Sequence, residues 1–268
     1  MDDEQFRQLL DRFNLSWDGY RKVRKGVKKR LRRHMQKSGC RNVQEYLQAL
    51  ERNPQLRNEC KQLLTVSISR FFRDRRLWEV LETDILPAIF NSAREEIRVW
   101  SAGCALGQEV YTFKILWQKL EESKGNGPRL RLWATDVNPD YIRRAQEGIY
   151  SPSALKEVPE RFLRTHFRRP KGKKSFLVNP ILKQGVIWEI RDLLSPPPGS
   201  GFDLVFLRNN LFTYYSPELK RPAFANIAES IRRGGYVIIG SHEALPADFE
   251  DSFTKRYHPC ILEKETFA

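Results

Sequence analysis

The chain of 268 residues has 40% hydrophobic and 30% charged side chains, a composition typical of globular proteins that excludes a disordered chain. Its apolar runs, such as 236–240, are only a few residues long, whereas a membrane helix needs about 20, so we expect no membrane insertion. The 47 Lys and Arg residues outnumber the 33 Asp and Glu residues, and the net charge of +14 indicates an acidic partner.

Residues 1–75 predict a basic, helical N-terminal domain. Apolar residues recur at helical spacing in 6–13 and 43–50, and Asn42 with Glu45 forms a capping-box pattern before the second set. Another helix is expected after Pro54. Between these elements, a single long helix is predicted by an apolar stripe that comprises Trp17, Tyr20, Val23, Val27 and Leu31.

That long helix carries a basic segment, residues 21–33, which contains no acidic residue. Its nine cations are Arg21, Lys22, Arg24, Lys25, Lys28, Lys29, Arg30, Arg32 and Arg33. Three interpretations are open: a docking surface for an acidic helix, a solvated helix face, or a nucleic-acid interface with a steep salt dependence. Against nucleic acid, Trp17 and Tyr20 lie on the apolar stripe and are not interleaved with the cations for base stacking.

A helical linker is expected over 76–95, and strands alternate with helices from about residue 97, which predicts an α/β domain over 96–268 with a mostly parallel sheet. The expected strands are 97–101, 130–135, 186–190, 203–207 and 236–239, followed by an antiparallel pair within 254–263. The expected helices are 109–120, 139–146 and 217–232, the last of them ending at Gly234 and Gly235. The stretch 148–185 lacks clean periodicity and predicts either an inserted subdomain or a long excursion of the chain.

The cysteines and the N-terminus indicate a reducing compartment. Cys40, Cys60, Cys104 and Cys260 are scattered without a CxxC pair, so free thiols and no metal site are expected, and the four histidines form no ligand motif either. The first residues, MDDE, are acidic and do not resemble a secretory signal. We therefore expect a cytoplasmic protein.

The turn after the first predicted strand has the composition of a ligand-binding loop. Residues 101–109 read SAGCALGQE, and these small residues, Gly103 among them, let a ligand approach the backbone at the carboxyl end of a parallel strand. The loop matches neither a dinucleotide fingerprint nor a phosphate loop, and it ends in Glu109, which suits an ammonium or sulfonium group. Asp136, after the second strand, could accept both hydroxyls of a ribose. Together these features predict a site for S-adenosylmethionine.

Each of these residues also has a purely structural interpretation. Asp136 could cap the helix that follows it, and Glu109 could be a first-turn carboxylate stabilised by the helix dipole. Cys104 is interpreted as a packed small residue, since no histidine is placed to activate it as a nucleophile.

Several further segments resemble one enzyme family in their order along nearly the whole chain. They are SRFFRD at 69–74, WSAGC at 100–104 with Gly107, Glu109 and Tyr111, ATD at 134–136, GIY at 148–150, FDLVFLRN at 202–209 and RGGY at 233–236. In these motifs the chain resembles the CheR-type chemotaxis receptor methyltransferases, which transfer a methyl group from S-adenosylmethionine to receptor glutamates. The resemblance implies a class I, Rossmann-like methyltransferase fold with a helical N-terminal domain and a small antiparallel subdomain within 148–185.

The same resemblance implies a set of site residues. The implied cofactor contacts are Ser67, Ser69, Arg73, Gly103, Glu109, Asp136, Asp192, Leu193, Arg208 and Asn209. Among them, Glu109 would bind the methionine amino group, Asp136 the ribose, and Asp192 with Leu193 would lie beside the adenine. Arg73 would orient a carboxylate, and Tyr214 would match the active-site tyrosine and line the methyl-transfer channel.

A glutamate acceptor agrees with the residues present. A glutamate carboxylate has a pKa of about 4.3 and is already ionised at neutral pH, so its methylation needs no general base. The resemblance also implies that the basic segment docks an acidic helix of a receptor. Two alternatives remain open: methylation of RNA or another acidic substrate, and a non-catalytic module that binds S-adenosylmethionine in signalling.

Overall fold

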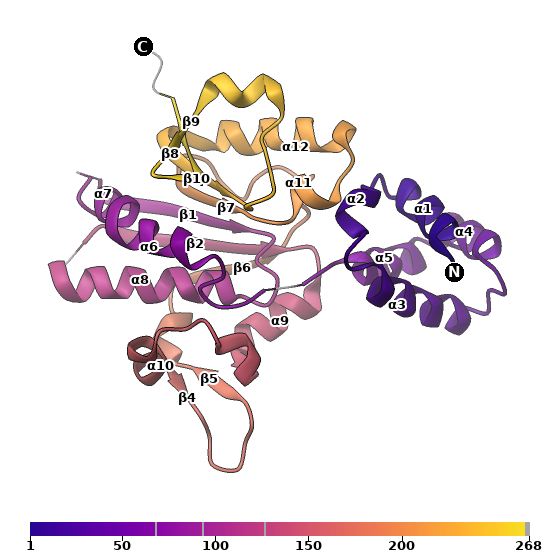
Figure 1. Cartoon of the computed structure of the whole chain (residues 1–268), viewed down its shortest axis with the longest axis horizontal. Helices are drawn as coiled ribbons and strands as arrows, with labels where there is room; N and C mark the ends of the chain where they lie inside the picture. Colours follow the sequence, from indigo (N-terminus) through magenta and orange to yellow (C-terminus); the bar gives the residue numbers. More distant parts are fainter. Residues whose placement is uncertain (68, 93, 126, 266–268) are drawn as a thin grey trace. The chain divides into compact units, whose positions relative to one another are not determined.

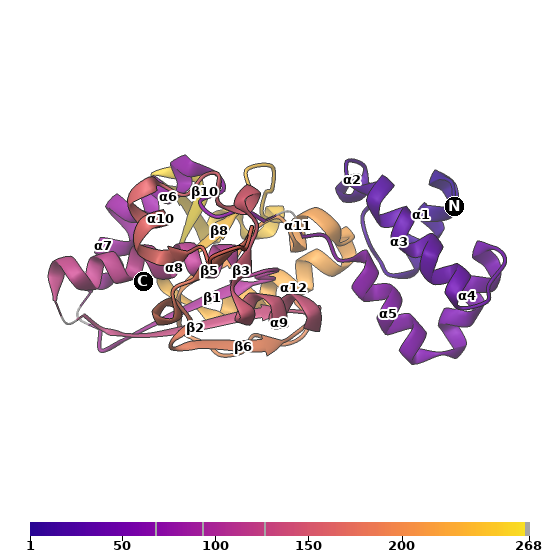
Figure 2. The same ribbon diagram turned by 90° about the horizontal axis from the view of Figure 1, so that it is seen from below.

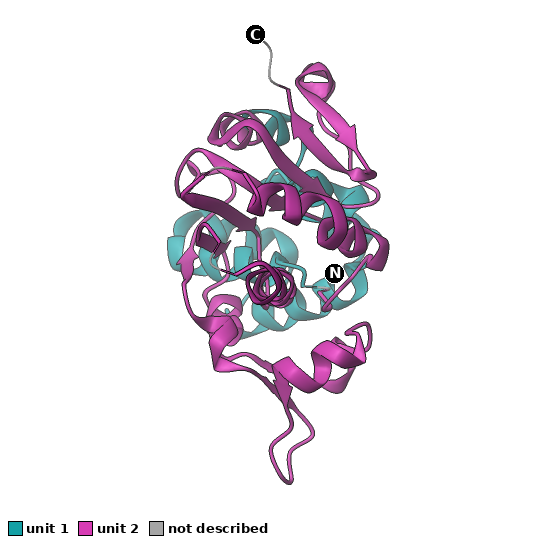
Figure 3. Cartoon of the chain, turned by 90° about the vertical axis from the view of Figure 1, so that its left-hand side faces the viewer, with its two compact units in different colours: residues 1–67, 209–222 teal, residues 68–208, 223–268 magenta. Residues whose placement is uncertain are grey.

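The computed structural model describes residues 1–67, 69–92, 94–125 and 127–265, which form two compact units (Figure 3). The helical unit comprises 1–67 and 209–222, and the sheet unit comprises 68–208 and 223–268. The first unit therefore ends before residue 75, the boundary expected from the sequence, and it includes a segment from the second half of the chain that the sequence placed in the other domain.

The helical unit contains five consecutive helices, shown in Figure 1: α1 (Asp3–Arg12), α2 (Trp17–Tyr20), α3 (Arg24–Lys37), α4 (Val43–Arg52) and α5 (Pro54–Leu64). Side chains cap three of them, since Asp2, Asn42 and Asn53 accept the backbone N–H groups of Gln5, Glu45 and Leu56. The helices enclose an apolar core that includes Phe6, Leu9, Leu10, Tyr20, Val27, Leu31, Tyr46, Leu50, Cys60 and Leu64.

The prediction of one long helix around the basic segment is wrong, because the structure has two helices there. Helix α2 ends at Tyr20 and α3 begins at Arg24. Between them the Val23 N–H donates to the Tyr20 carbonyl, a three-residue step that interrupts the α-helical ladder. The predicted stripe still packs inward on both sides of this break, with Tyr20, Val27 and Leu31 buried.

The segment 209–222 completes the helical unit. It contains the short helix α11 (Leu211–Tyr214) and the beginning of α12 (Pro217–Ser230). A β-bridge pairs Leu15 with Tyr215, and the Ser16 N–H donates to the Tyr214 carbonyl at 2.8 Å. This part of the chain is thus held to the loop between α1 and α2 by backbone hydrogen bonds.

The sheet unit is built on seven strands: β1 (Glu96–Ala102), β2 (Arg129–Asp136), β6 (Val186–Ile190), β7 (Phe202–Leu207), β8 (Ile231–Ile239), β9 (Phe253–Arg256) and β10 (His258–Lys264). Their order is β6-β2-β1-β7-β8-β10-β9. The first five in this order run parallel, and β10 is antiparallel to both of its neighbours, which confirms the predicted α/β fold. The chain moves outward from β1 in both directions, so β1 and its neighbours form the switch point where such sheets bind ligands.

Helices cover this sheet, as Figures 1 and 2 show. They are α6 (Arg75–Val80), a π-helical turn (Leu81–Ile85), α7 (Leu86–Phe90), α8 (Gln108–Lys124), α9 (Pro139–Glu147) and the rest of α12, with a short 3-10 turn at Ala247–Ser252. Aromatic rings join the layers, since Phe206 of the fully buried β7 packs against Trp78 and Phe113.

The end of α12 differs from the prediction. The helix ends at Ser230, and Gly234 and Gly235 lie inside β8 instead of terminating the helix. They form an irregularity in the pairing of β7 with β8, where Gly234 has a φ of +66°. A Cβ atom on Gly235 would lie 2.7 Å from the Phe202 carbonyl oxygen, so close strand approach accounts for this glycine.

The segment 149–183 forms a subdomain within the region predicted for an insertion. Its antiparallel strands β3 (Ile149–Tyr150), β5 (Phe176–Val178) and β4 (Phe167–Arg168) lie in that order, and a hairpin loop extends from β4 and β5 in Figure 1. The turns Pro152–Leu155 and Pro180–Lys183 and helix α10 (Glu160–His166) complete it. The ring of Phe71 packs against Tyr150 and Phe167, which explains why residues 69–75 belong to the sheet unit.

No helix among the described residues is long and apolar enough to cross a bilayer. No group of three or more His, Cys, Asp or Glu side chains in that part of the chain is arranged to hold a metal ion. The four cysteines are free thiols.

Candidate functional site

The loop after β1 turns sharply and is tied to the end of β2. Gly103, Ala105 and Gly107 have φ values of +76°, +48° and +82°, a left-handed conformation that glycine adopts without strain. The N–H groups of Gly103 and Cys104 both donate to the Thr135 carbonyl at 2.8 Å. The loop backbone therefore lies beside the carboxyl ends of two adjacent parallel strands.

Glu109, in the first turn of α8, is held by groups from two strands. The Ser101 hydroxyl of β1 donates to its Oε1 at 2.8 Å, and the guanidinium of Arg208, just after β7, lies 3.3 Å from its Oε2. Burial raises the pKa of Glu109, and the charge of Arg208 opposes this shift. These specific partners distinguish Glu109 from an ordinary carboxylate at a helix N-terminus.

Arg208 is a buried cation between two acids. Its side chain is 5% exposed, and its Nη2 donates to the carboxylate of Asp74 and, at 3.3 Å, to the Arg73 carbonyl. Its Nε is buried and has no hydrogen-bond partner among the described residues. Arg208 thus links Asp74 to Glu109, and its Nε remains an unused donor.

The Arg73 carbonyl is fixed from two sides, because the Trp78 indole also donates to it at 2.9 Å. Phe72 and Asp74, its neighbours, have left-handed φ values of +52° and +65°, which are uncommon for residues with side chains. Asp74 is the site residue that the sequence analysis missed. Its position in the SRFFRD motif, next to Arg73, was the only available signal.

Asp136 lies at the end of β2 and receives backbone hydrogen bonds on both oxygens. The Ala105 N–H donates to Oδ2 at 3.0 Å and the Asn138 N–H donates to Oδ1 at 2.9 Å. Burial raises the pKa of Asp136 to about 6. The Val137 backbone also donates to this carboxylate. Because a carboxylate has roughly four acceptor positions, Asp136 keeps acceptor capacity for a ligand hydroxyl.

Asp136 does not cap helix α9, which was the alternative interpretation of this residue. The N-cap of α9 is Asn138, whose side chain accepts the Asp140 N–H at 3.0 Å. Cys104 is buried, and this burial raises the pKa of its thiol, which leaves it protonated at neutral pH and unsuited to act as a nucleophile.

The turn after β6 lies beside the end of β2. The Arg191 N–H donates to the Asp136 carbonyl at 3.0 Å, and Asp192 Oδ1 accepts the Leu194 N–H at 3.1 Å. Asp192 and Leu193 are half-buried in this turn. The sheet unit therefore brings Gly103, Glu109, Asp136, Asp192, Leu193 and Arg208 to the carboxyl ends of β1, β2, β6 and β7.

The remaining predicted site residues are divided between the two units. Ser69 and Arg73 belong to the sheet unit, whereas Ser67, Asn209 and Tyr214 belong to the helical unit. Within its own unit, the ring of Tyr214 packs edge-to-face against Tyr20 with ring centres 5.0 Å apart. The roles expected of these five residues stay predictions.

The cations of the basic segment are not equivalent. Arg24 and Lys28 pair with Asp3, and Arg30 donates to the carbonyls of Leu63 and Thr65. We define the basic face as four of the remaining cations at helical spacing, Lys22, Lys25, Lys29 and Arg33, which are exposed and have no ion pair to any described residue.

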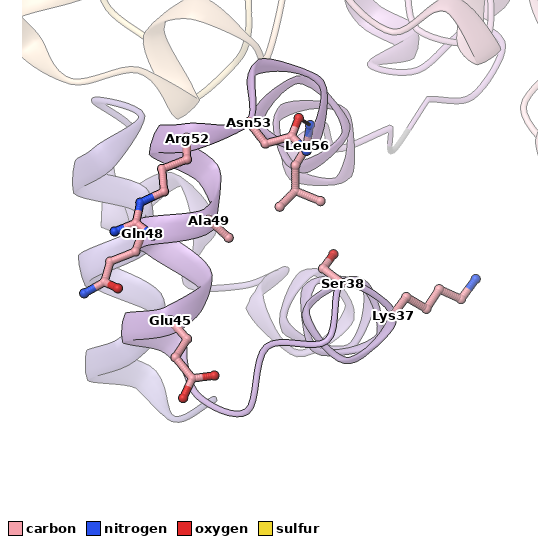
Figure 4. Close-up of a pocket in the computed structure, with 8 residues that line it drawn as sticks. All are labelled: Lys37, Ser38, Glu45, Gln48, Ala49, Arg52, Asn53 and Leu56. Carbon is pink, nitrogen blue, oxygen red and sulfur yellow. Dashed lines mark hydrogen bonds between the residues drawn. The ribbon is translucent and has the colours of Figure 1, made fainter.

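The helical unit also has an open groove of about 680 Å³ between α3, α4 and α5 (Figure 4). Its lining is mixed and comprises Lys37, Ser38, Glu45, Gln48, Ala49, Arg52, Asn53 and Leu56. None of the predicted site residues lines it.

The chemistry of the sheet unit's site fits an adenosine ligand with an amino-acid tail. Glu109 can accept hydrogen bonds from an ammonium, the unused Nε of buried Arg208 can donate to an anionic or polar group, and Asp136 keeps acceptor capacity for a ligand hydroxyl. A Cβ atom on Gly107 would lie 2.9 Å from the Ala145 Cβ, so this turn tolerates only glycine next to the site.

Comparison with known proteins agrees with this chemistry. The family model described as CheR methyltransferase, SAM binding domain, matches residues 67–260. A chemotaxis protein methyltransferase of Listeria innocua is 34% identical over 207 residues, which cover 76% of each chain. Chemotaxis protein methyltransferase Cher2 of Pseudomonas putida is 29% identical over 252 residues, covering 91% of this chain and 90% of that protein. The chain therefore belongs to the CheR methyltransferase family, with a class I methyltransferase fold and S-adenosylmethionine as its cofactor.

Proposed function

We propose that the protein transfers the methyl group of S-adenosylmethionine to glutamate side chains of a signalling receptor in the cytoplasm, forming methyl esters. The observation that carries this proposal is the placement of Glu109 and Asp136 beside one left-handed turn at the ends of β1 and β2, in a chain of the CheR family. The relatives with matching sequences are named chemotaxis protein methyltransferases, which supports a receptor as the acceptor.

In this proposal, residues at the ends of different strands bind different parts of the cofactor. Glu109 accepts hydrogen bonds from the amino group, Asp136 from the ribose hydroxyls, and the turn with Asp192 and Leu193 lies against the adenine. The backbone at Gly103 forms the floor of the site. Ser67, Ser69, Arg73, Arg208 and Asn209 complete the proposed contacts.

The residues of the chain have to position and desolvate the reactants. When bound, the cofactor supplies a methyl group that is activated by its attachment to a positively charged sulfur. A glutamate acceptor, with a pKa of about 4.3, arrives ionised, so no side chain has to remove a proton. Arg73 orients the acceptor carboxylate by bidentate hydrogen bonds, and Tyr214 lines the channel through which the methyl group passes. Exclusion of water at these residues strengthens the attraction between the positively charged sulfur and the acceptor carboxylate.

The acceptor segment is proposed to be an acidic helix that docks on the basic face. Lys22, Lys25, Lys29 and Arg33 recur at helical spacing, and their exposure leaves them available to carboxylates of a partner. Such a surface would attract the acidic helix by long-range electrostatics, and this attraction would weaken as salt is added.

Incubation with S-adenosylmethionine that carries a tritiated methyl group tests the proposal. With the cytoplasmic fragment of a chemoreceptor as the probe, the expected result is label on the fragment that is released as methanol by mild base, as a carboxyl methyl ester requires. Label on added RNA instead would favour a nucleic-acid methyltransferase. Cofactor binding with no transfer to either acceptor would favour a non-catalytic module.

A further inference from the structure

We propose that helix α2 of the helical unit positions Tyr214 for methyl transfer, and that Gly19 is the critical positioning residue. This role rests on the proposed function of Tyr214 in the methyl-transfer channel. The N-terminal helices would then do more than bind a partner, because they hold in place a segment that lies almost 200 residues further along the chain.

The backbone around Tyr214 is fixed on both sides. The Ser16 N–H donates to the Tyr214 carbonyl at 2.8 Å, and the Ser216 N–H donates to the Asn14 carbonyl at 2.9 Å. Between these two hydrogen bonds, Tyr215 forms an antiparallel bridge with Leu15. This short ladder sets the register of Tyr214 against the loop that precedes α2.

Gly19 allows α2 to approach the same segment more closely than any side chain would. A Cβ atom at this position would lie 2.0 Å from the Thr213 carbonyl oxygen and 3.3 Å from the Tyr214 Cα. The φ of Gly19 is not in the left-handed range, so the close approach, and not the backbone conformation, requires glycine here. Any larger residue must push Thr213 and Tyr214 away from α2.

Tyr20, the next residue, supports the ring of Tyr214 directly. Tyr20 is 3% exposed, and its hydroxyl donates to the Leu64 carbonyl at 2.9 Å. Its ring meets that of Tyr214 edge-to-face, with ring centres 5.0 Å apart. The support is therefore anchored in the core of the helical unit.

Helix α11 could not hold Tyr214 in place alone. It has only four residues, Leu211–Tyr214, and a single helical turn is unstable without tertiary contacts. Asn210 accepts the N–H groups of Leu211 and Tyr214 within this turn, but the contacts that fix its far end come from residues 14–20.

The test compares Gly19→Ala with Gly26→Ala, whose added methyl group would meet no atom within 4 Å. We expect Gly19→Ala to lower kcat by about 10–100-fold, the effect of a displacement on the order of 1 Å, with the Kd for S-adenosylmethionine unchanged. Gly26→Ala should keep both constants. In protein labelled with 3-fluorotyrosine, the resonance of Tyr214, assigned by its loss in Tyr214→Phe, should move in Gly19→Ala and stay in place in Gly26→Ala.

A second variant covers the case in which Gly19→Ala fails to fold. Ser16 has a φ of −78°, which proline can adopt, so Ser16→Pro removes the hydrogen bond to the Tyr214 carbonyl without backbone strain. It should also move the Tyr214 resonance and lower kcat, by less than Gly19→Ala does.

The outcomes separate this inference from the proposed function. If Tyr214→Phe lowers kcat while Gly19→Ala and Ser16→Pro both match Gly26→Ala in kcat, the positioning role is overturned and the role of Tyr214 stands. A movement of the resonance without loss of kcat likewise overturns positioning for catalysis. If Tyr214→Phe keeps full kcat, the role of Tyr214 fails first, and the positioning role fails with it.

Discussion

Arg208 donates a hydrogen bond to Glu109 across 3.3 Å, which joins the residue after β7 to the first turn of α8. Both side chains are largely buried, at 5% and 14% exposure, so their charges are poorly screened by water. Arg208 is shared with Asp74, and this sharing leaves Glu109 with negative charge available to a ligand ammonium.

Glu109→Gln should weaken the binding of S-adenosylmethionine by about 10–100-fold, since a hydrogen bond between charged groups contributes roughly 1.5–3 kcal/mol. Isothermal titration calorimetry gives the Kd. The control is a ligand without the amino-acid tail, 5′-methylthioadenosine, which the variant and the unmodified protein should bind equally. Equal losses for both ligands would contradict the assignment of Glu109 to the amino group.

Asp74→Asn should also weaken cofactor binding, although by less than Glu109→Gln. Asparagine tolerates the left-handed φ of +65°, so the backbone is kept while the charge is lost. Arg208 would then pair more fully with Glu109 and reduce its attraction for an ammonium. Glu79→Gln, on the exposed side of α6, is the control and should bind normally. Equal affinities of the two variants would show that Asp74 does not act through Arg208.

The affinity for S-adenosylmethionine should fall as the pH decreases through 6. Burial raises the pKa of Asp136 to about 6. Only the ionised form offers both oxygens to ribose hydroxyls, and at about pH 5 roughly one tenth of it remains ionised, so Kd should rise up to about tenfold. The pKa of Glu109 is also raised by burial and acts in the same direction. Asp136→Asn should therefore bind weakly and show a shallower pH profile. A variant profile as steep as that of the unmodified protein would contradict this.

Gly107→Ala should destabilise the protein by about 1–3 kcal/mol more than Gly185→Ala does. Both glycines have left-handed φ values, +82° and +73°, so both substitutions incur similar backbone strain. Only at Gly107 would the new methyl group meet neighbours, the Ala145 Cβ at 2.9 Å and the Trp188 ring at 3.2 Å. Urea denaturation gives the free energies of unfolding, and equal values for the two variants would be inconsistent with a closely packed turn.

Reversing two charges of the basic face should weaken docking of the receptor fragment. For Lys25→Glu with Lys29→Glu, we expect KM for the fragment to rise on the order of tenfold at low salt, with the difference shrinking as salt is added. The matched control reverses Lys171 and Lys174, two exposed lysines of the subdomain hairpin. If the control pair raises KM equally, net charge and not the basic face is responsible.

The strand ends were predictable because their signals are local. Glu109 and Asp136 each follow an apolar run that ends in a turn, and parallel strands bring such ends together. The contacts of Asp74 with Arg208 were not predictable in this way, since 134 residues separate them along the chain. No spacing rule relates side chains so far apart.

The wrong predictions have the same origin. Gly234 and Gly235 carry the signal of a helix end, but the close approach of β7 to β8 places them in a strand irregularity. Segment 209–222 packs beside α2 only because Gly19 has no side chain. The backbone that Gly19 contacts, at Thr213, lies in the second half of the chain. Tertiary packing determined the structure of these elements, whereas local periodicity was sufficient to predict the central strands of the sheet.

A crystal structure with S-adenosylhomocysteine, the product left after methyl transfer, would locate the cofactor site. We expect the amino group of this ligand within hydrogen-bond distance of Glu109 and its two ribose hydroxyls on Asp136, at the carboxyl ends of β1 and β2. A ligand bound elsewhere, or one whose amino group and ribose contact neither carboxylate, would contradict this expectation.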